Sequence, residues 1–459
     1  MTRGDDGPAQ TQHPVSEVVP AEWLEVRIRT RTARGIADEI ALLIERHPTL
    51  KGRYLPTVRN LAATLRVSPT TVAHAWHFLV DARLIRTGGS QGTFIRDDDT
   101  RPAHRFRAVS DYQRSLLDLS TPVPDPELLP TLLPRLATLA HGTVIPEVNQ
   151  YGGEPILPAL LDHARETWPF EADLFTASNG GYDGVLLLME SLVRPGTRVA
   201  VENPTAAPFL DLIEYLGGQA VPVATDDAGM LPEALETALA MRPAVVLIQP
   251  RFSAPAGHTL TEERAAELAM VLLSAETTPM IIEDDPAPGL ARGDAVSLGN
   301  WLPDNVVLVR SWNKSHGPDL RVAVMGGAEQ LVRAAQTRRS MGAVWTSRIL
   351  QALLVGMLRD PTVEADIGHA SAVYRSRHAA LAGALRDQGI ATTGWQGWSL
   401  WVPVRDEDAA VAALLDNGIK AAPGRNFLAA RSGAPFLRVA ITQLPVEESP
   451  RVASILARA

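Results

Sequence analysis

Lys314 is the residue whose side-chain chemistry this chain could least replace. The sequence contains 43 basic residues, and only Lys51, Lys314 and Lys420 among them are lysine. Arginine supplies positive charge almost everywhere else, so a retained lysine points to amine chemistry. Unlike a guanidinium, a lysine amine has an accessible neutral form and can form an imine with a carbonyl compound. Lys314 is therefore a candidate reactive group, whereas the segment 419–424 around Lys420 is predicted to be an exposed turn.

A carboxylate and a phosphate-binding segment accompany Lys314. Asp284 follows the apolar run 280–282, and Arg321 lies seven residues beyond the lysine. The segment 178–182 contains two glycines and opens a helical stretch, where free backbone amides can bind a phosphate. Pyridoxal phosphate requires a lysine for an imine, a carboxylate for its pyridine nitrogen and a cationic phosphate site. The sequence therefore predicts a pyridoxal 5'-phosphate site.

Strands and helices must alternate to bring these groups together. Short apolar runs cover residues 199–201, 244–248, 280–282, 306–309 and 322–324. Strands that are apolar on both faces and separated by helices indicate a mostly parallel sheet covered on both sides, hence an α/β fold. Ligands on such sheets bind beyond the carboxyl ends of the strands, which is where Asp284 and Lys314 fall.

The N-terminal part predicts a small DNA-binding domain over residues 21–96. Twelve Arg/Lys minus six Asp/Glu give this part a net charge of +6, although the whole chain carries −9. A basic head on an acidic body indicates that the head alone binds a polyanion. Apolar spacing and caps predict helices over 32–47, 58–65 and 70–82, and then strands over 84–86 and 92–95 around a glycine-rich tip. This pattern is a winged helix-turn-helix for double-stranded DNA.

Other features narrow the class of protein. Residues 97–114 begin with a charged segment without apolar periodicity, which predicts an exposed linker. The chain has no cysteine, which excludes disulfides and thiolate metal sites, and we expect no metal. It also has no run of about 18 uncharged apolar residues, so we expect no membrane span. The first residues lack the apolar stretch of a signal peptide, so we expect a cytoplasmic protein.

Motifs in both parts resemble known families. The segments LPTVRNLA (55–62), VSPTTV (67–72) and GTF (92–94) resemble the GntR-type winged helix. Residues 115–459, with SWNK at 311–314, resemble fold-type I aminotransferases, with a large subdomain over about 150–345 and a smaller α+β subdomain over about 346–459. Together the two parts resemble a MocR-type regulator of the GntR superfamily.

The resemblance implies a role for each candidate residue. Lys314 would hold the cofactor as an imine, and Asp284 would pair with the pyridine nitrogen, with Asp285 as its rival. The phosphate would be held by Arg321, Ser311, Gly180 and Gly181. Arg438 would bind the carboxylate of an amine or amino-acid effector as a bidentate pair, or else belong to a structural ion pair. The DNA-contacting residues would be Arg59, Ser68, Thr70, Thr71 and Gly92.

Three positions depart from the aminotransferase pattern. Ala206 replaces the aromatic residue that stacks on the cofactor ring, although Phe209 or Tyr182 could compensate. Ala254 replaces the amide side chain that contacts the phenolic oxygen, and Pro286 replaces a tyrosine. Because missing donors of this kind weaken catalysis strongly, we expect ligand sensing without efficient turnover and assign no catalytic residue.

The sequence thus predicts a homodimeric transcription regulator that senses pyridoxal phosphate, an amine or an amino acid. Aminotransferase-like domains pair about a two-fold axis, which suits a repeated or palindromic operator. Two alternatives remain: a regulator whose body is a cofactor-free dimerisation scaffold, and an active aminotransferase with an accessory head.

Overall fold

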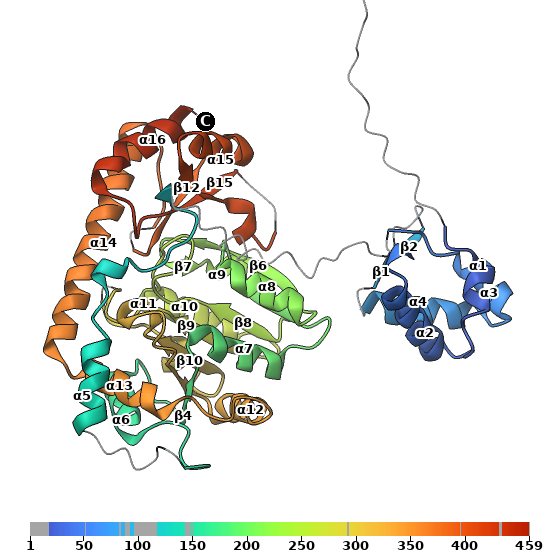
Figure 1. The fold of residues 1–459 in the computed structure, drawn as a ribbon, viewed down its shortest axis with the longest axis horizontal. Coiled ribbons are helices and arrows are strands. Elements are labelled where there is room, and N and C mark those ends of the chain that lie inside the picture. Colours follow the sequence, from blue (N-terminus) through green and yellow to red (C-terminus); the bar gives the residue numbers. More distant parts are fainter. Residues whose placement is uncertain are drawn as a thin grey trace, which may run out of the picture. The chain divides into compact units, whose positions relative to one another are not determined.

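A computed structural model describes residues 18–50, 52–81, 84–87, 92–95, 117–142, 148, 150–291, 293–394, 396–430 and 434–458 (Figure 1). The chain divides into two compact units, Met1–Ala103 and His104–Ala459. The predicted linker, residues 97–114, and most of the predicted wing tip, residues 88–91, lie outside the described residues. No helix in the described ranges is long and apolar enough to cross a membrane.

The N-terminal unit is a helix-turn-helix followed by a hairpin. Its elements are α1 (Ala21–Glu25), α2 (Ala33–Arg46), a 3-10 turn (Pro48–Leu50), α3 (Val58–Leu65), α4 (Pro69–Asp81), β1 (Ile85–Thr87) and β2 (Thr93–Ile95). The three predicted helices and two predicted strands are confirmed to within two residues, whereas α1 was not predicted. The helices bury a common core that includes Ile36, Leu61 and Trp76. This core fixes α3 and α4 against each other.

An eight-stranded sheet organises the C-terminal unit, in the order β4-β11-β10-β9-β8-β5-β6-β7. The strands are β4 (Leu174–Ser178), β5 (Arg198–Asn203), β6 (Gln219–Asp226), β7 (Gly229–Met230), β8 (Val245–Ile248), β9 (Met280–Asp285), β10 (Val306–Ser311) and β11 (Ala323–Gly327). The five central strands run parallel, whereas β11 is antiparallel to both of its neighbours. The predicted mostly parallel sheet is therefore confirmed.

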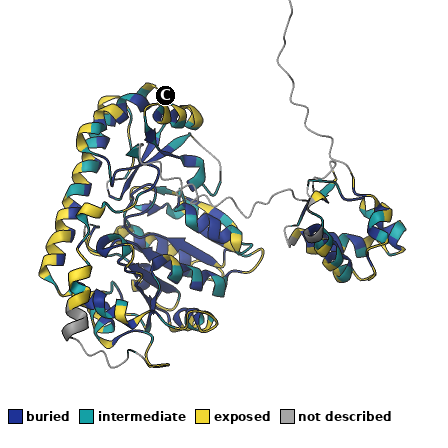
Figure 2. Cartoon of the chain, in the orientation of Figure 1, coloured by how far each residue is buried: buried dark blue, intermediate teal, exposed yellow. Residues whose placement is uncertain are grey.

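Helices cover both faces of this sheet. The helices of the C-terminal unit are α5 (Leu133–Gly142), α6 (Pro158–Thr167), α7 (Gly181–Leu192), α8 (Ala207–Tyr215), α9 (Pro232–Leu239), α10 (Glu262–Leu273), α11 (Asn313–His316), α12 (Glu329–Ser340), α13 (Arg348–Leu358), α14 (Pro361–Asp387), α15 (Glu407–Asp416) and α16 (Ser449–Arg458). Ile282 and Val309 face α7, α8 and α12, whereas Ile281 and Leu308 face α9 and α10. Figure 2 shows the strands as the most deeply buried layer. Neighbouring residues of one strand therefore serve opposite faces.

A smaller sheet lies in the C-terminal part of this unit. Its order is β12 (Ser399–Pro403), β15 (Phe436–Ala440) and β14 (Ala422–Pro423), and all of its pairings are antiparallel. The long helix α14 extends from α16 to α13 along one side of the unit (Figure 1).

The expectation that residues 419–424 form an exposed turn is wrong. Strand β13 (Ile419–Lys420) pairs in parallel with β3 (Leu117–Asp118). Leu117 N–H donates to the Gly418 carbonyl at 2.9 Å, and Ile419 is fully buried. A partner strand from a distant part of the chain overrides the local turn signal of this segment.

Candidate cofactor, effector and DNA sites

The carboxyl ends of β9 and β10 bring the predicted cofactor residues together. Asp284 is the last but one residue of β9 and pairs with Val309 of β10, and Ser311 is the last residue of β10. Asp284 has the same parity as Ile282, which places it on the face covered by α7. A side chain built at Gly181 would put its Cβ 2.9 Å from Ser311 Cβ and 3.4 Å from Asp284 Oδ1. These three residues therefore form one site.

Gly180 and Gly181 make a close cradle at the N-terminus of α7. Gly180 has φ of +91°, which favours glycine. A Cβ there would lie 2.7 Å from the Asn313 side-chain amide and 2.8 Å from Arg321 Nη2. Arg321, which is exposed, donates to the Asn179 carbonyl at 3.1 Å. The helix N-terminus, a hydroxyl and a guanidinium thus surround one position, as phosphate binding requires.

Lys314 lies in α11, directly after β10. Its amine makes no hydrogen bond or ion pair with any residue in the described part of the chain. Burial lowers the pKa of Lys314, although Asp284 and Asp285 act in the opposite direction. A lowered pKa favours the neutral amine, which is the form that reacts with a carbonyl.

Asp284 is buried and is held by Gln249. The Gln249 amide Nε2 donates to Asp284 Oδ2 at 2.8 Å, and its Oε1 accepts from the Ala254 N–H at 2.9 Å. Burial raises the pKa of Asp284 to about 6, against the opposing effects of Lys314 and the Gln249 hydrogen bond. Gln249 was not predicted as a site residue. The sequence feature that could have identified Gln249 is its position, since it is a polar residue directly after the apolar run 244–248.

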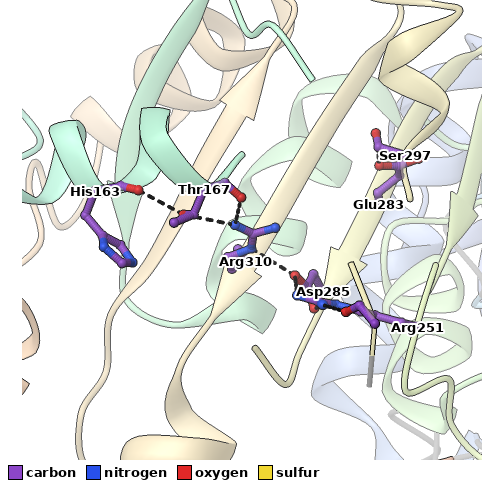
Figure 3. Close-up of polar contacts among 8 residues, drawn as sticks. His163, Thr167, Arg251, Glu283, Asp285, Ser297 and Arg310 are labelled. Atoms are coloured by element: carbon purple, nitrogen blue, oxygen red, sulfur yellow. Dashed lines mark hydrogen bonds and ion pairs between the residues drawn. The ribbon is translucent and has the colours of Figure 1, made fainter. Parts of the chain in front are cut away.

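Asp285 has a different environment from Asp284. It accepts from Arg251 at 2.9 and 2.8 Å and from Arg310 at 2.9 Å (Figure 3). Burial acts to raise the pKa of Asp285, but the two guanidinium groups bring it below its ordinary value. Its alternation with Asp284 directs it to the opposite face of the sheet. Asp284 is therefore the carboxylate on the side of the glycine cradle.

Of the three departures from the aminotransferase pattern, Ala254 is directly linked to this site. Ala254 contributes its backbone N–H to Gln249 but no side-chain donor, and Ala206 immediately precedes α8. Phe209 is buried in the sheet core, and the Tyr182 hydroxyl donates to the Pro208 carbonyl at 3.3 Å. Lys314, Asp284 and the glycine cradle thus lie close together at the carboxyl ends of β9 and β10, and position 254 contributes no amide side chain.

Arg438 is buried on β15, in the smaller sheet. Its Nη2 donates to the Ser120 carbonyl, and its guanidinium carbon lies 4.5 Å from the centre of the Phe427 ring. Within the described ranges it forms no salt bridge, and its Nε is buried without a partner. Burial lowers the pKa of Arg438 to about 9, with Asp118 acting in the opposite direction. The alternative role for Arg438 was membership of a structural ion pair. No such pair with Arg438 is found among the described residues.

Four of the predicted DNA-contacting residues lie on the helix-turn-helix, and the fifth, Gly92, immediately precedes β2 of the hairpin. Thr57 caps α3, and Arg66 takes a left-handed conformation in the turn. Ser68 Oγ caps α4 by accepting from the Thr71 N–H at 3.1 Å, and it also lies 2.8 Å from the Thr71 hydroxyl. Arg59, Ser68, Thr70 and Gly92 are exposed and Thr71 is partly buried. Ser68 and Thr71 thus have a structural role as well.

Both units match families of known proteins. Residues 144–456 match the model for aminotransferase class I and II, and residues 32–95 match the model for bacterial regulatory proteins of the gntR family. The chain is 31% identical to the vitamin B6 salvage pathway transcriptional repressor PtsJ of Salmonella typhimurium, over 84% of this chain and 88% of that protein. It is 24% identical to the pyridoxine biosynthesis regulator PdxR of Corynebacterium glutamicum, over 77% and 78% of the two chains.

Solved aminotransferases share the fold of the C-terminal unit. The α-aminoadipate aminotransferase LysN of Thermus thermophilus superposes with a TM-score of 0.67 at 21% identity, over 78% of this chain and 94% of that one. The kynurenine aminotransferase of Pyrococcus horikoshii gives the same TM-score and identity, over 75% and 90%. At this identity the likeness establishes the fold.

Proposed function

We propose that this chain, which belongs to the MocR-type transcriptional regulators, binds operator DNA with its N-terminal unit and senses pyridoxal phosphate with its C-terminal unit. One observation carries the cofactor part of the proposal. Asp284, Ser311 and Gly181 meet within a single site next to Lys314, whose amine has no partner among the described residues. The names of PtsJ and PdxR, which refer to vitamin B6 and pyridoxine, support the same ligand class.

Each residue has a definite task in this proposal. When bound, pyridoxal phosphate supplies an aldehyde that reacts with amines and a ring that withdraws electrons. Lys314, with its lowered pKa, provides the neutral amine that anchors the aldehyde. Asp284 in its ionised form holds a proton on the ring nitrogen, and the glycine cradle with Ser311 and Arg321 binds the phosphate. Arg438 binds the carboxylate of an amino-acid effector through its unpartnered donor.

The same site favours sensing over efficient transamination. The Ala254 side chain offers no donor, and the Gln249 amide is already occupied by Asp284 and the Ala254 N–H. Electrostatic positioning of this kind commonly contributes about 3 kcal/mol per donor to catalysis. Incubation of the pyridoxal phosphate-loaded protein with amino acids should therefore yield keto acid at a rate far below that of an aminotransferase.

Homodimerisation is a further part of the proposal. An exposed apolar surface includes Tyr151, which is 96% exposed, together with Met341 and Val344. The Tyr151 ring contacts the Trp345 ring edge-on, at 5.8 Å between centres. Monomers rarely expose such a group of large apolar side chains without a partner, and a second copy brings a second DNA-binding unit for a two-fold operator.

Sensing requires that the ligand favours one state of the protein over another, because a ligand with equal affinity for both states shifts nothing. The direct test uses a duplex selected from random DNA by the full-length protein. Pyridoxal phosphate should change the affinity of the wild type for this duplex and leave that of Lys314→Ala unchanged. Equal affinities with and without pyridoxal phosphate in the wild type would reject the sensor function and favour a cofactor-free scaffold.

A further inference from the structure

A cavity opens on the face of β9 and β10 opposite Asp284. Its volume is about 570 Å³, within the range of small-molecule sites. Arg251 and Arg310 line it on one side, and Trp312, Val363 and Ile367 supply apolar walls. The cavity shares no residue with the glycine cradle.

The two arginines bring an excess positive charge into the protein interior. Both guanidinium groups bind Asp285, and Arg310 Nη1 also donates to the Thr167 carbonyl at 2.8 Å (Figure 3). The side chains of Arg251 and Arg310 are only 10% and 5% exposed. Two cations against one carboxylate leave one positive charge uncompensated within this group. Buried charge of this kind normally has a partner.

Part of the hydrogen-bonding capacity of these arginines is unused. Arg310 Nη2 has no hydrogen-bond partner within the described part of the chain, and Arg251 Nη1 reaches only the Gly293 carbonyl, at 3.4 Å. Burial lowers the pKa of Arg310, and the nearby charge of Arg251 lowers it further, against the effect of Asp285. An anion in the cavity would relieve this repulsion and occupy the free donors.

We propose that this cavity is a second ligand site, for a small organic acid with one negative charge and an apolar body. Its carboxylate binds Arg310 and Arg251, and its body packs against Trp312, Val363 and Ile367.

A single charge is favoured over a double one by the surrounding groups. Burial lowers the pKa of His316 to about 4 and also lowers that of His163, so both lining histidines are neutral at pH 7. The remaining charged lining residues are Asp294 and Glu364, which are exposed, so solvent screens their charge more than that of the two buried arginines. Their residual repulsion acts on any anion and is larger for a double charge. The site therefore compensates one negative charge only.

The cavity is connected to the cofactor site through the backbone. Asp285 is adjacent to Asp284 in β9, and Trp312 and His316 flank Lys314 around α11. An acid bound here is thus placed to influence the position of Lys314. The binding itself does not depend on the proposed sensing of pyridoxal phosphate, so the two proposals can fail separately.

Calorimetric titration of the full-length protein without pyridoxal phosphate tests the site. Benzoate serves as the monoanionic probe, benzamide as its neutral analogue and phenyl phosphate as a dianion. We expect benzoate to bind this cavity more tightly than both analogues. Phenyl phosphate can also occupy the glycine cradle, so only the part of its binding that Gly368→Leu weakens belongs to the cavity. Absence of benzoate binding at millimolar concentration, equal binding of benzamide, or tighter binding of phenyl phosphate that Gly368→Leu weakens would each overturn the proposal.

Substitutions at two glycines of α14 provide a matched pair of variants that test whether benzoate binds in this cavity. Gly368 lines the cavity, whereas Gly383 lies further along the helix, and a Cβ at either position meets nothing within 4 Å. Gly368→Leu adds a side chain to the cavity lining while both arginines are retained, and it should weaken benzoate binding by about tenfold or more. Gly383→Leu should leave it unchanged. Benzoate binding of wild-type strength in Gly368→Leu would place the probe elsewhere and overturn the assignment.

Discussion

The Gln249 amide donates a hydrogen bond of 2.8 Å to the Asp284 carboxylate. The same amide accepts from the Ala254 N–H, so a backbone group at position 254 orients the residue that supports the acid. Although Ala254 provides no side-chain contact, it therefore still organises the cofactor site. The pKa of Asp284 is lowered by this bond and raised by burial, and burial prevails.

Replacement of Gln249 should weaken pyridoxal phosphate binding. In Gln249→Leu the donor is lost and the pKa of Asp284 rises further, so less of the carboxylate is ionised to hold the ring nitrogen. A hydrogen bond to a charged group contributes about 1.5 to 3 kcal/mol, which predicts at least about tenfold weaker binding. Absorption titration with pyridoxal phosphate measures this. Gln249→Glu keeps the acceptor for Ala254 but adds a second carboxylate, so its binding should be weaker too. Wild-type affinity in both variants would contradict the role of Gln249.

Because the pKa of Asp284 is raised, the free energy of unfolding of the cofactor-free protein should decrease as the pH rises. Its pKa is about 6 in the folded protein and 3.8 ordinarily, so the folded state binds the proton more strongly. The stabilisation is full below the ordinary value and is lost as the pH rises through 6. A difference of about two pKa units corresponds to about 3 kcal/mol.

The variant Asp284→Asn removes this titration. Relative to the wild type, the free energy of unfolding of Asp284→Asn should increase between pH 4 and pH 8, by up to about 3 kcal/mol. Chemical denaturation at several pH values measures the difference, and Glu283, whose pKa is also raised, is present in both proteins and cancels. The same variant should bind pyridoxal phosphate more weakly. A stability difference that is independent of pH would contradict the buried, ionised Asp284.

Arg59→Ala should weaken operator binding and reduce its dependence on salt. If Arg59 contacts one phosphate, the slope of log affinity against log salt should fall by about 0.9. Arg34→Ala is the control, because Arg34 is exposed in the same unit and forms an ion pair with Asp38 at 3.2 Å. Titration of a selected duplex at several salt concentrations measures both. Equal slopes for Arg59→Ala and the wild type would remove Arg59 from the DNA-contacting set.

Tyr151→Glu should shift the protein towards the monomer. The change places a charge in the exposed apolar surface and should raise the dimer dissociation constant by about tenfold or more. Tyr215→Glu is the matched control, since Tyr215 is 68% exposed at the end of α8. Sedimentation velocity over a range of concentrations measures the effect. A dimer that tolerates Tyr151→Glu as well as Tyr215→Glu would show that this surface is not the interface.

Local signals were sufficient for the helix-turn-helix and hairpin of the N-terminal unit, although not for α1, and for much of the large sheet. Thr57 and Ser68 cap their helices as predicted, because a cap depends on neighbours within a few residues. The apolar runs ending before Asp284 and Lys314 likewise correspond to β9 and β10.

Pairings between distant segments were missed. The strand at Ile419 forms only because Leu117 lies beside it. The ion pairs of Asp285 with Arg251 and Arg310 depend on the register of β9 against β10 and on the loop after β8. The residue spacing within one segment cannot predict such a contact, because the two side chains come from different strands that the sheet brings together.

The absorption spectrum of the full-length protein with added pyridoxal phosphate tests the central claim most directly, with Lys314→Ala beside it. We predict that the wild type produces the shifted band of lysine-bound cofactor and that Lys314→Ala, with unchanged circular dichroism, produces only the band of free pyridoxal phosphate. Identical spectra for the two proteins would contradict the assignment of Lys314 as the residue through which this regulator holds its cofactor.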